Sequence, residues 1–173
     1  MSAVTHQFDD VRPILIPVDP SGCAAEVVGA AADVAAGLGA RAILLDVVRA
    51  VNGVERGARV RGRSVQAVLR DDACAHLREL ADILESSGVE VGLAVREGDV
   101  VDTILSEARQ EGAQMIVMGT HGRTGLARAI YGSVAEAVIR KAELPVMVVR
   151  TRSAASHPGM STAQAQVEAE SMG

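Results

Sequence analysis

The sequence predicts a single α/β domain with a mostly parallel sheet and helices on both of its faces. Apolar runs of strand length alternate with amphipathic helical patterns four times, and a final apolar run closes the series. This is the order expected of consecutive βαβ units. Most of the runs are nearly continuous, as in strands buried on both faces. The length of 173 residues suits one domain with a substantial core.

The first strand and helix come before residue 40. Residues 13–18 form a short apolar run that predicts a strand. The turn Asp19-Pro20-Ser21-Gly22 follows, and Ser21 is a candidate N-cap. Residues 23–38 carry Val and Ala at helical spacing, and Gly39 suits the position just beyond that helix.

The middle of the chain continues the alternation. Residues 42–48 are predicted to be the second strand, an apolar run that only Asp46 interrupts. Residues 49–63 combine three glycines with several arginines, so we expect a loop with a basic bias. A long helix is predicted over about residues 64–87, because leucine, valine and alanine recur along one of its faces.

Three further strands are predicted. Residues 89–95 alternate apolar side chains with polar or small ones, which favours a half-covered strand at or near a sheet edge. Asp99 suits the N-cap of the third helix, which Gly112 ends. The fourth and fifth strands are predicted at residues 115–118 and 146–149.

The two ends of the chain differ from the rest in composition. Residues 1–11 are acidic and lack an apolar signal-peptide segment, so we expect a flexible lead. Residues 151–173 are rich in Ser, Ala, Gln and Glu with little to bury, so we expect a disordered tail.

Composition and charge exclude several classes of function. The net charge is −5 and the aromatic residues are one Phe and one Tyr, which argues against nucleic-acid binding through phosphates or base stacking. No apolar run approaches the length needed to span a membrane, so we expect a cytoplasmic protein. Cys23 and Cys74 are far apart in sequence, and we expect two free thiols rather than a disulfide.

A glycine-rich pattern follows the fourth strand. Gly119, Gly122 and Gly125 punctuate a loop, and a helical pattern begins at Gly132-Ser133. Glycines let backbone N–H groups approach an anion because no Cβ stands in the way. A helix N-terminus adds free donors and a partial positive charge. The sequence has no Gly-Lys pair for a Walker loop and no GxGxxG after the first strand, so we hypothesise a different phosphate site.

The spacing Gly119-x2-Gly122-x9-Gly132-Ser133 matches the G-x2-G-x9-G-S/T signature of the universal stress protein family, in its ATP-binding subgroup. The sequence resembles that family over residues 12–150, from a first strand that ends in Asp19 to a last strand that follows Leu144-Pro145. The resemblance implies a three-layer α/β/α domain of the adenine-nucleotide alpha-hydrolase-like, Rossmann-like type. Its five-stranded parallel sheet would have the order 3-2-1-4-5. Strands one and four would then adjoin where the winding reverses, which is where such sheets bind ligands.

The resemblance also implies a set of site residues. Asp19 would contact the ribose or the adenine edge, beside the preceding Val18, and Gly119 would approach the ribose. The adenine would lie against apolar side chains, namely Pro17, Val47 and Met118. The phosphates would be held through Gly122, Gly132, Ser133 and Val134, with His121 and the cations of Arg123 and Arg128 as further candidates.

Each of these residues also has a structural explanation. Ser133-x-x-Glu136 is a capping-box pattern that would account for Ser133 without a ligand. The loop glycines and Asp19 are residues that turns favour. Val47 and Met118 could serve only the core, and His121 could be a solvated loop residue. The sequence departs from the family at Asp46, where many members carry His, which leaves ligand preference open.

The resemblance implies an ATP-binding regulator of the stress response rather than an enzyme. Ser133 has no evident His/Asp partners, so no catalytic residues are predicted, with at most slow ATP hydrolysis. Mg²⁺ could arrive with the triphosphate, since no His/Cys/Asp cluster has metal-ligand spacing. A homodimer through the last strand, Val146–Val149, is implied. The alternatives are a cyclic AMP or AMP binder of the same family, a ligand-free interaction module and a very slow ATPase.

Overall fold

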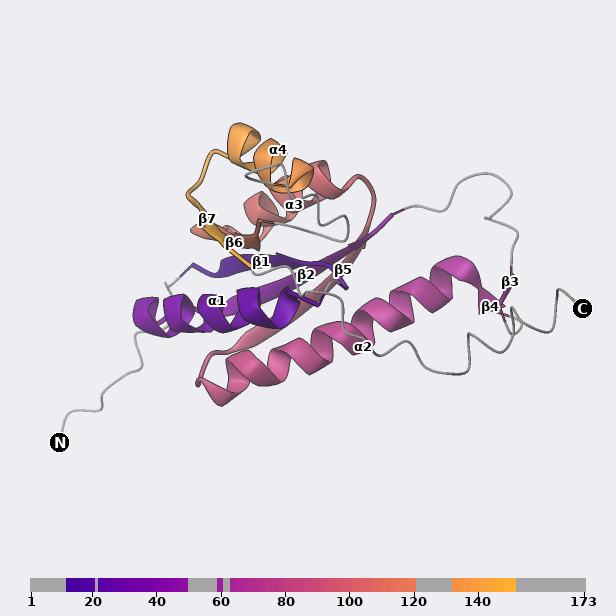
Figure 1. Ribbon diagram of the computed structural model, residues 1–173, viewed down its shortest axis with the longest axis horizontal. Coiled ribbons are helices and arrows are strands. Elements are labelled where there is room, and N and C mark those ends of the chain that lie inside the picture. Colours follow the sequence, from indigo (N-terminus) through magenta and orange to yellow (C-terminus); the bar gives the residue numbers. More distant parts are fainter. Residues whose placement is uncertain (1–11, 21, 50–58, 61–62, 121–131, 152–173) are drawn as a thin grey trace, which may run out of the picture.

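The computed structural model describes residues 12–20, 22–49, 59–60, 63–120 and 132–151. Within them lies a sheet of five parallel strands, sandwiched between two pairs of helices (Figure 1). The strands are β1 (Ile14–Val18), β2 (Ala42–Val48), β5 (Val91–Glu97), β6 (Met115–Gly119) and β7 (Val146–Val149). The helices are α1 (Ala24–Leu38), α2 (Val65–Ser86), α3 (Val100–Gln110) and α4 (Ser133–Lys141).

The order of the strands is β5-β2-β1-β6-β7, all of them parallel. Counted along the chain, this is the predicted order 3-2-1-4-5, which is confirmed. β1 and β6 therefore adjoin, although about a hundred residues separate them in sequence, with Ile14 beside Met115. Their carboxyl ends mark the point where the winding of the sheet reverses.

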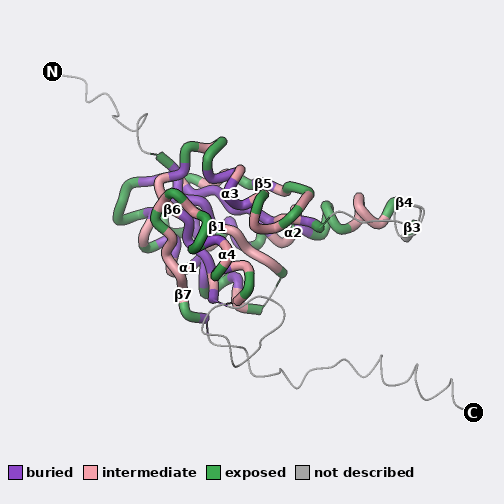
Figure 2. Tube along the Cα trace, turned by 90° about the horizontal axis from the view of Figure 1, so that it is seen from above, coloured by how far each residue is buried: buried purple, intermediate pink, exposed green. Residues whose placement is uncertain are grey.

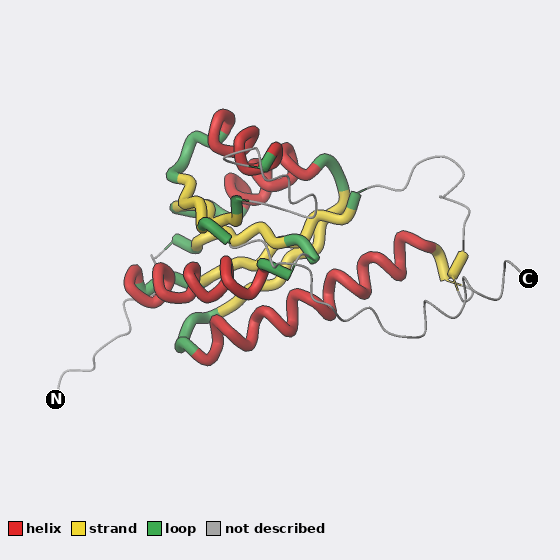
Figure 3. The backbone as a smooth tube through the Cα atoms, viewed as in Figure 1, coloured by secondary structure: helices red, strands yellow, loops and turns green. Residues whose placement is uncertain are grey.

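Each face of the sheet has its own aliphatic core. Ile14, Ile16 and Leu44 pack towards α1 and α2, whereas the alternate residues Leu15 and Ile43 belong to the core with α3 and α4. The alternation follows from the two-residue period of side chains along a strand. Figure 2 shows the central strands buried and the outer helix surfaces exposed, and Figure 3 shows the same layers by secondary structure.

Local capping explains where two helices begin. Ser64 Oγ accepts a hydrogen bond from Ala67 N–H at 3.2 Å. Ser64 is therefore the N-cap of α2, which begins at Val65. The Asp99 carboxylate accepts from Val101 N–H and Asp102 N–H at 3.0 and 3.1 Å, which confirms it as the N-cap of α3. The proposed cap Ser21 lies outside the described residues, and Cys23 is the N-cap of α1 without a capping hydrogen bond from its side chain.

The third strand of the sheet begins and ends two residues later than predicted, as β5 (Val91–Glu97). Val89 N–H bonds to Leu84 C=O in the turn after α2, so it is not available to the sheet. At the other end, Gly98 N–H bonds to Val48 C=O, which extends the pairing with β2. β5 is the last strand in the order of the described sheet and pairs there with β2 alone, which confirms its place at an edge.

Part of the predicted basic loop has regular structure. Arg59–Val60 (β3) and Arg63–Ser64 (β4) pair as short antiparallel strands before α2. Residues 50–58 and 61–62 lie outside the described residues, as do the predicted lead, 1–11, and residues 152–173 of the predicted tail. Cys23 and Cys74 are free thiols, as predicted.

Gly98 joins β5 to α3 in a conformation that side chains disfavour. Its φ is 153°, and an added Cβ would lie 2.8 Å from Thr103 Oγ1. We expect Gly98→Ala to lower the free energy of unfolding by about 1 to 2 kcal/mol. As the control, Gly29→Ala lies within α1 and its Cβ meets open space, so that change should stabilise by about 0.5 to 1 kcal/mol. Urea denaturation of both variants tests the contrast, and equal effects would contradict it.

Candidate nucleotide site

A cavity of about 710 Å³ opens at the carboxyl ends of β1, β2 and β6. Its size falls within the usual range for small-molecule sites. All nine described residues of the predicted site line it: Pro17, Val18, Asp19, Val47, Met118, Gly119, Gly132, Ser133 and Val134. The other three, His121, Gly122 and Arg123, lie outside the described residues, as do Gly125 and Arg128. The fold thus brings four separate segments of the chain to one cavity.

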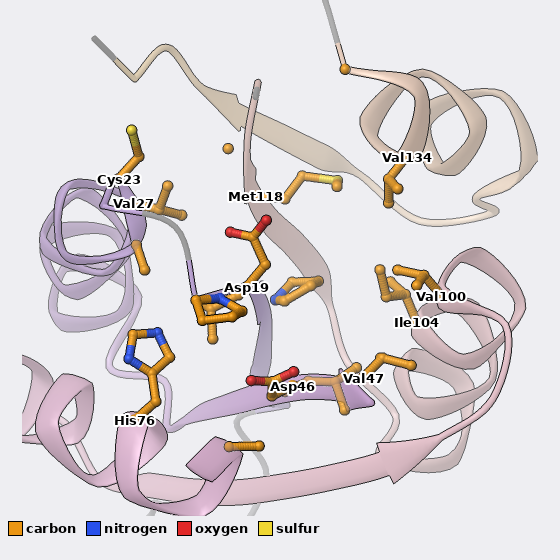
Figure 4. Close-up of a pocket in the computed structure, with 18 of the residues that line it drawn as sticks. Asp19, Cys23, Val27, Asp46, Val47, His76, Val100, Ile104, Met118 and Val134 are labelled. Carbon is orange, nitrogen blue, oxygen red and sulfur yellow. The ribbon is translucent and has the colours of Figure 1, made fainter. Parts of the chain in front are cut away.

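The side of the cavity next to α3 and α4 is apolar. Val47 and Met118 belong to the core on this face, and α3 adds Val100 and Ile104 while α4 adds Val134. Figure 4 shows these five side chains gathered on one side of the cavity. An apolar surface of this kind suits the faces of a planar base.

The opposite side, next to α1 and α2, is more polar. Asp46 lies in β2, two residues before its end, and is only 6% exposed, and Asp72 and His76 come from α2. Figure 4 shows the Asp19 carboxylate at the centre of the cavity, with Asp46 and His76 below it and Cys23 above. His76 Nε2 is buried without a hydrogen-bond partner in the described part of the chain. No sequence motif marks the α2 residues, because the pattern of an amphipathic helix does not show that one of its faces borders a cavity.

The N-terminus of α4 closes one end of the cavity. Gly132 is the N-cap without a side-chain hydrogen bond, and Ser133 is the first residue of the helix. The capping-box explanation of Ser133 is therefore wrong, because a capping box needs the serine at the N-cap. The first bond of the helix is Glu136 N–H to Gly132 C=O at 3.0 Å. The N–H groups of Ser133, Val134 and Ala135 precede it and face no helical acceptor.

The hydrogen bond from Gly132 N–H to Thr120 C=O holds the start of α4 next to the end of β6. Thr120 N–H in turn bonds to Val149 C=O at 3.1 Å. These bonds fix both ends of the glycine-rich segment at the rim of the cavity. They also occupy the N–H group of Gly132, so it is not a free donor here.

The described residues contain neither a candidate metal cluster nor a candidate membrane-spanning helix. No three His, Cys, Asp or Glu side chains come together there in a way that could hold a metal ion. None of the helices described has both the length and the hydropathy that crossing a membrane requires.

Comparisons with known proteins agree on one family. The model of the universal stress protein family matches residues 10–150. A universal stress protein of Methanocaldococcus jannaschii is 32% identical over 139 residues, which cover 80% of this chain and 82% of the relative. A solved family member from Burkholderia pseudomallei has a TM-score of 0.64 at 28% identity, covering 80% and 95% of the two chains. The Archaeoglobus fulgidus protein in complex with dAMP has a TM-score of 0.59 at 25% identity, covering 82% and 98%.

Proposed function

The chain belongs to the universal stress protein family, and on that premise we propose that it is an ATP-binding regulator of the stress response in the cytoplasm. The observation that carries the proposal is the cavity at the crossover between β1 and β6, which nine of the predicted residues line. The relative in complex with dAMP supports an adenine nucleotide as the class of ligand. The glycine signature, which resembles that of the ATP-binding subgroup, supports the triphosphate.

The chemistry of the cavity gives the nucleotide one orientation. The adenine lies against Val47 and Met118 on the apolar side, and Asp19 meets the ribose or the adenine edge. The phosphates lie at the N-terminus of α4, where the helix dipole and free N–H groups favour an anion. The reverse orientation would place the phosphates beside Asp46 and Asp72, whose carboxylates repel them.

The phosphate donors are the first residues of α4. Ser133 offers both its hydroxyl, which caps nothing, and its N–H group, and Val134 and Ala135 offer N–H groups. Gly132 is not a donor, since its N–H is bonded to Thr120 C=O. Its role is to let the phosphates approach the backbone closely. Mg²⁺ arrives with the triphosphate instead of being held by a set of protein carboxylates.

A displacement experiment tests the ligand and its orientation together. ATP should displace a fluorescent ATP analogue more effectively than AMP or cyclic AMP. Ser133→Ala should weaken the binding of ATP by about three- to ten-fold, because one hydrogen bond to a charged group is lost. The same change should leave the affinity for adenosine unchanged. Preferential displacement by cyclic AMP or AMP would support that alternative. No displacement by any of these ligands would leave a ligand-free interaction module.

We propose binding with at most slow hydrolysis. Efficient phosphoryl transfer needs a positioned base and a carboxylate that holds the metal, and Asp19 is the one carboxylate among the site residues predicted from the sequence. Phosphate release that is fast in the wild type and lost in Asp19→Ala would instead identify an ATPase.

We also propose a homodimer through β7. Among the described strands β7 pairs with β6 alone, and its four residues are half-buried. Bonds to β6 involve Pro145 C=O and Val149 C=O, so the alternate residues Val146 and Val148 direct their peptide groups outwards. An apolar edge of this kind needs to be covered.

Val148→Glu should break the dimer, because a two-fold interface brings both new carboxylates to the same edge. We expect the dimer dissociation constant to rise by at least about ten-fold in sedimentation velocity experiments. Leu38→Glu adds the same charge to an exposed position on α1 and should leave the dimer intact. A Val148→Glu protein that stays dimeric, or a monomeric wild type, would refute this interface.

A further inference from the structure

A second hollow, of about 270 Å³, lies between α2 and β5 and shares no lining residue with the nucleotide cavity. Leu77 from α2 is fully buried beside it, whereas Leu93 in the middle of β5 is 45% exposed. The rim carries the arginines Arg70 and Arg78, one turn before and one turn after Cys74 on α2. We refer to this feature as the α2–β5 groove.

The groove borders the outer edge of β5, with which no other described strand pairs. Ala42 N–H bonds to Glu90 C=O and Gly98 N–H to Val48 C=O, so the even-numbered residues of this segment direct their peptide groups to β2. The odd-numbered residues Val91, Leu93 and Val95 therefore direct theirs outwards. Val95 C=O accepts a bond from Arg96 Nη1 at 3.3 Å, which covers one end of the edge. The peptide groups around Leu93 remain available to another strand.

The two rim arginines have no ion-pair partner among the described residues, in a chain whose net charge is −5. Other described arginines do have acidic partners: Arg41 with Glu111, Arg63 with Asp71, Arg96 with Glu107 and Arg140 with Glu136. Asp82 lies one turn beyond Arg78 on α2 without forming a pair with it. The groove is thus a local positive site on an acidic protein.

The distance between the two rim arginines indicates which peptide would fit the groove. Eight residues of helix separate Arg70 from Arg78, which is roughly 12 Å along α2. Four residues of an extended strand span roughly 13 Å, and side chains four apart point to the same face. An acidic side chain opposite each arginine would therefore flank a residue that lies beside Leu93.

We propose that the α2–β5 groove docks an extended acidic peptide, which adds to β5 as a further strand. Backbone hydrogen bonds to the edge around Leu93 supply affinity, and side chains supply specificity, as in other cases of strand addition. The preferred pattern is two acidic residues four apart with an apolar residue midway. The groove and the nucleotide cavity use different residues of α2, and the groove lies at the opposite edge of the sheet from β7.

Fluorescence anisotropy with a labelled peptide, acetyl-Thr-Glu-Thr-Val-Thr-Glu-Thr-amide, tests the proposal. We expect saturable binding that weakens by at least about ten-fold in Arg70→Glu and in Arg78→Glu. Arg109→Glu, which changes the same charge at an exposed position on α3, should bind like the wild type. Thermal melts check that each variant is folded.

Two altered peptides separate strand addition from simple charge attraction. The peptide with Lys in place of both Glu residues, and the peptide N-methylated at Val and at both flanking Thr residues, should each lose binding. Equal binding of the N-methylated peptide would overturn strand addition. Equal loss in Arg109→Glu, or no saturable binding of the acidic peptide at millimolar concentration, would overturn the site.

Discussion

Val134→Trp is expected to abolish nucleotide binding without unfolding the protein. Val134 is half-buried at the start of α4 and lines the apolar side of the cavity (Figure 4). An indole ring there would occupy the space proposed for the adenine, while the backbone of the helix is preserved. We expect the dissociation constant for ATP to rise by about a hundred-fold, which corresponds to about 2.7 kcal/mol.

The matched control for this experiment lies on the same helix. Ile139 is exposed and does not line the cavity, so Ile139→Trp should bind ATP with the affinity of the wild type. Isothermal titration of both variants measures the difference. Unchanged affinity in Val134→Trp would show that the base binds elsewhere.

Arg96→Ala should be the more destabilising of two arginine substitutions. Arg96 Nε and Nη2 donate to the two carboxylate oxygens of Glu107 at 2.9 and 2.6 Å. The Glu107 side chain is 3% exposed and that of Arg96 45%, so the carboxylate depends on this partner. Removing the arginine leaves a buried charge, and we expect a loss of about 3 kcal/mol on unfolding by urea.

Arg140→Ala provides the comparison, because Arg140 forms a 4.0 Å ion pair with Glu136 in which both side chains are exposed. That change should cost less than about 0.5 kcal/mol. The double variant Arg96→Ala/Glu107→Met should recover most of the stability, since it leaves no buried charge. A single Arg96→Ala variant as stable as Arg140→Ala would contradict this account of the pair.

The periodicity of apolar residues in the sequence predicts the helices and strands, but it does not predict features that depend on tertiary contacts. The alternating pattern of the third strand indicated an edge, yet Val89 belongs to the preceding turn and the strand continues to Glu97. Leu38 is the apolar residue that ends the helical pattern of residues 23–38, yet it is 47% exposed. The Arg96–Glu107 pair was missed, although Glu107, one turn after Ile104 on the apolar face of α3, was a signal.

The candidate site was predictable where it follows strand ends. Asp19 and Gly119 end neighbouring strands, and the family resemblance supplied the order that makes them neighbours. Residues from α2, such as Asp72 and His76, could not be found this way, because long-range packing brings them to the cavity. Leu69 is one of the leucines that recur along the apolar face predicted for the 64–87 helix, but it is an exposed residue at the cavity.

The thermal unfolding midpoint of the wild type with and without millimolar ATP is the most direct test of the nucleotide site. A ligand that binds only the folded state raises the midpoint by mass action. We predict a rise in the wild type and in Ile139→Trp, and none in Val134→Trp. A folded wild type whose midpoint does not move with ATP would contradict the assignment of the cavity to ATP.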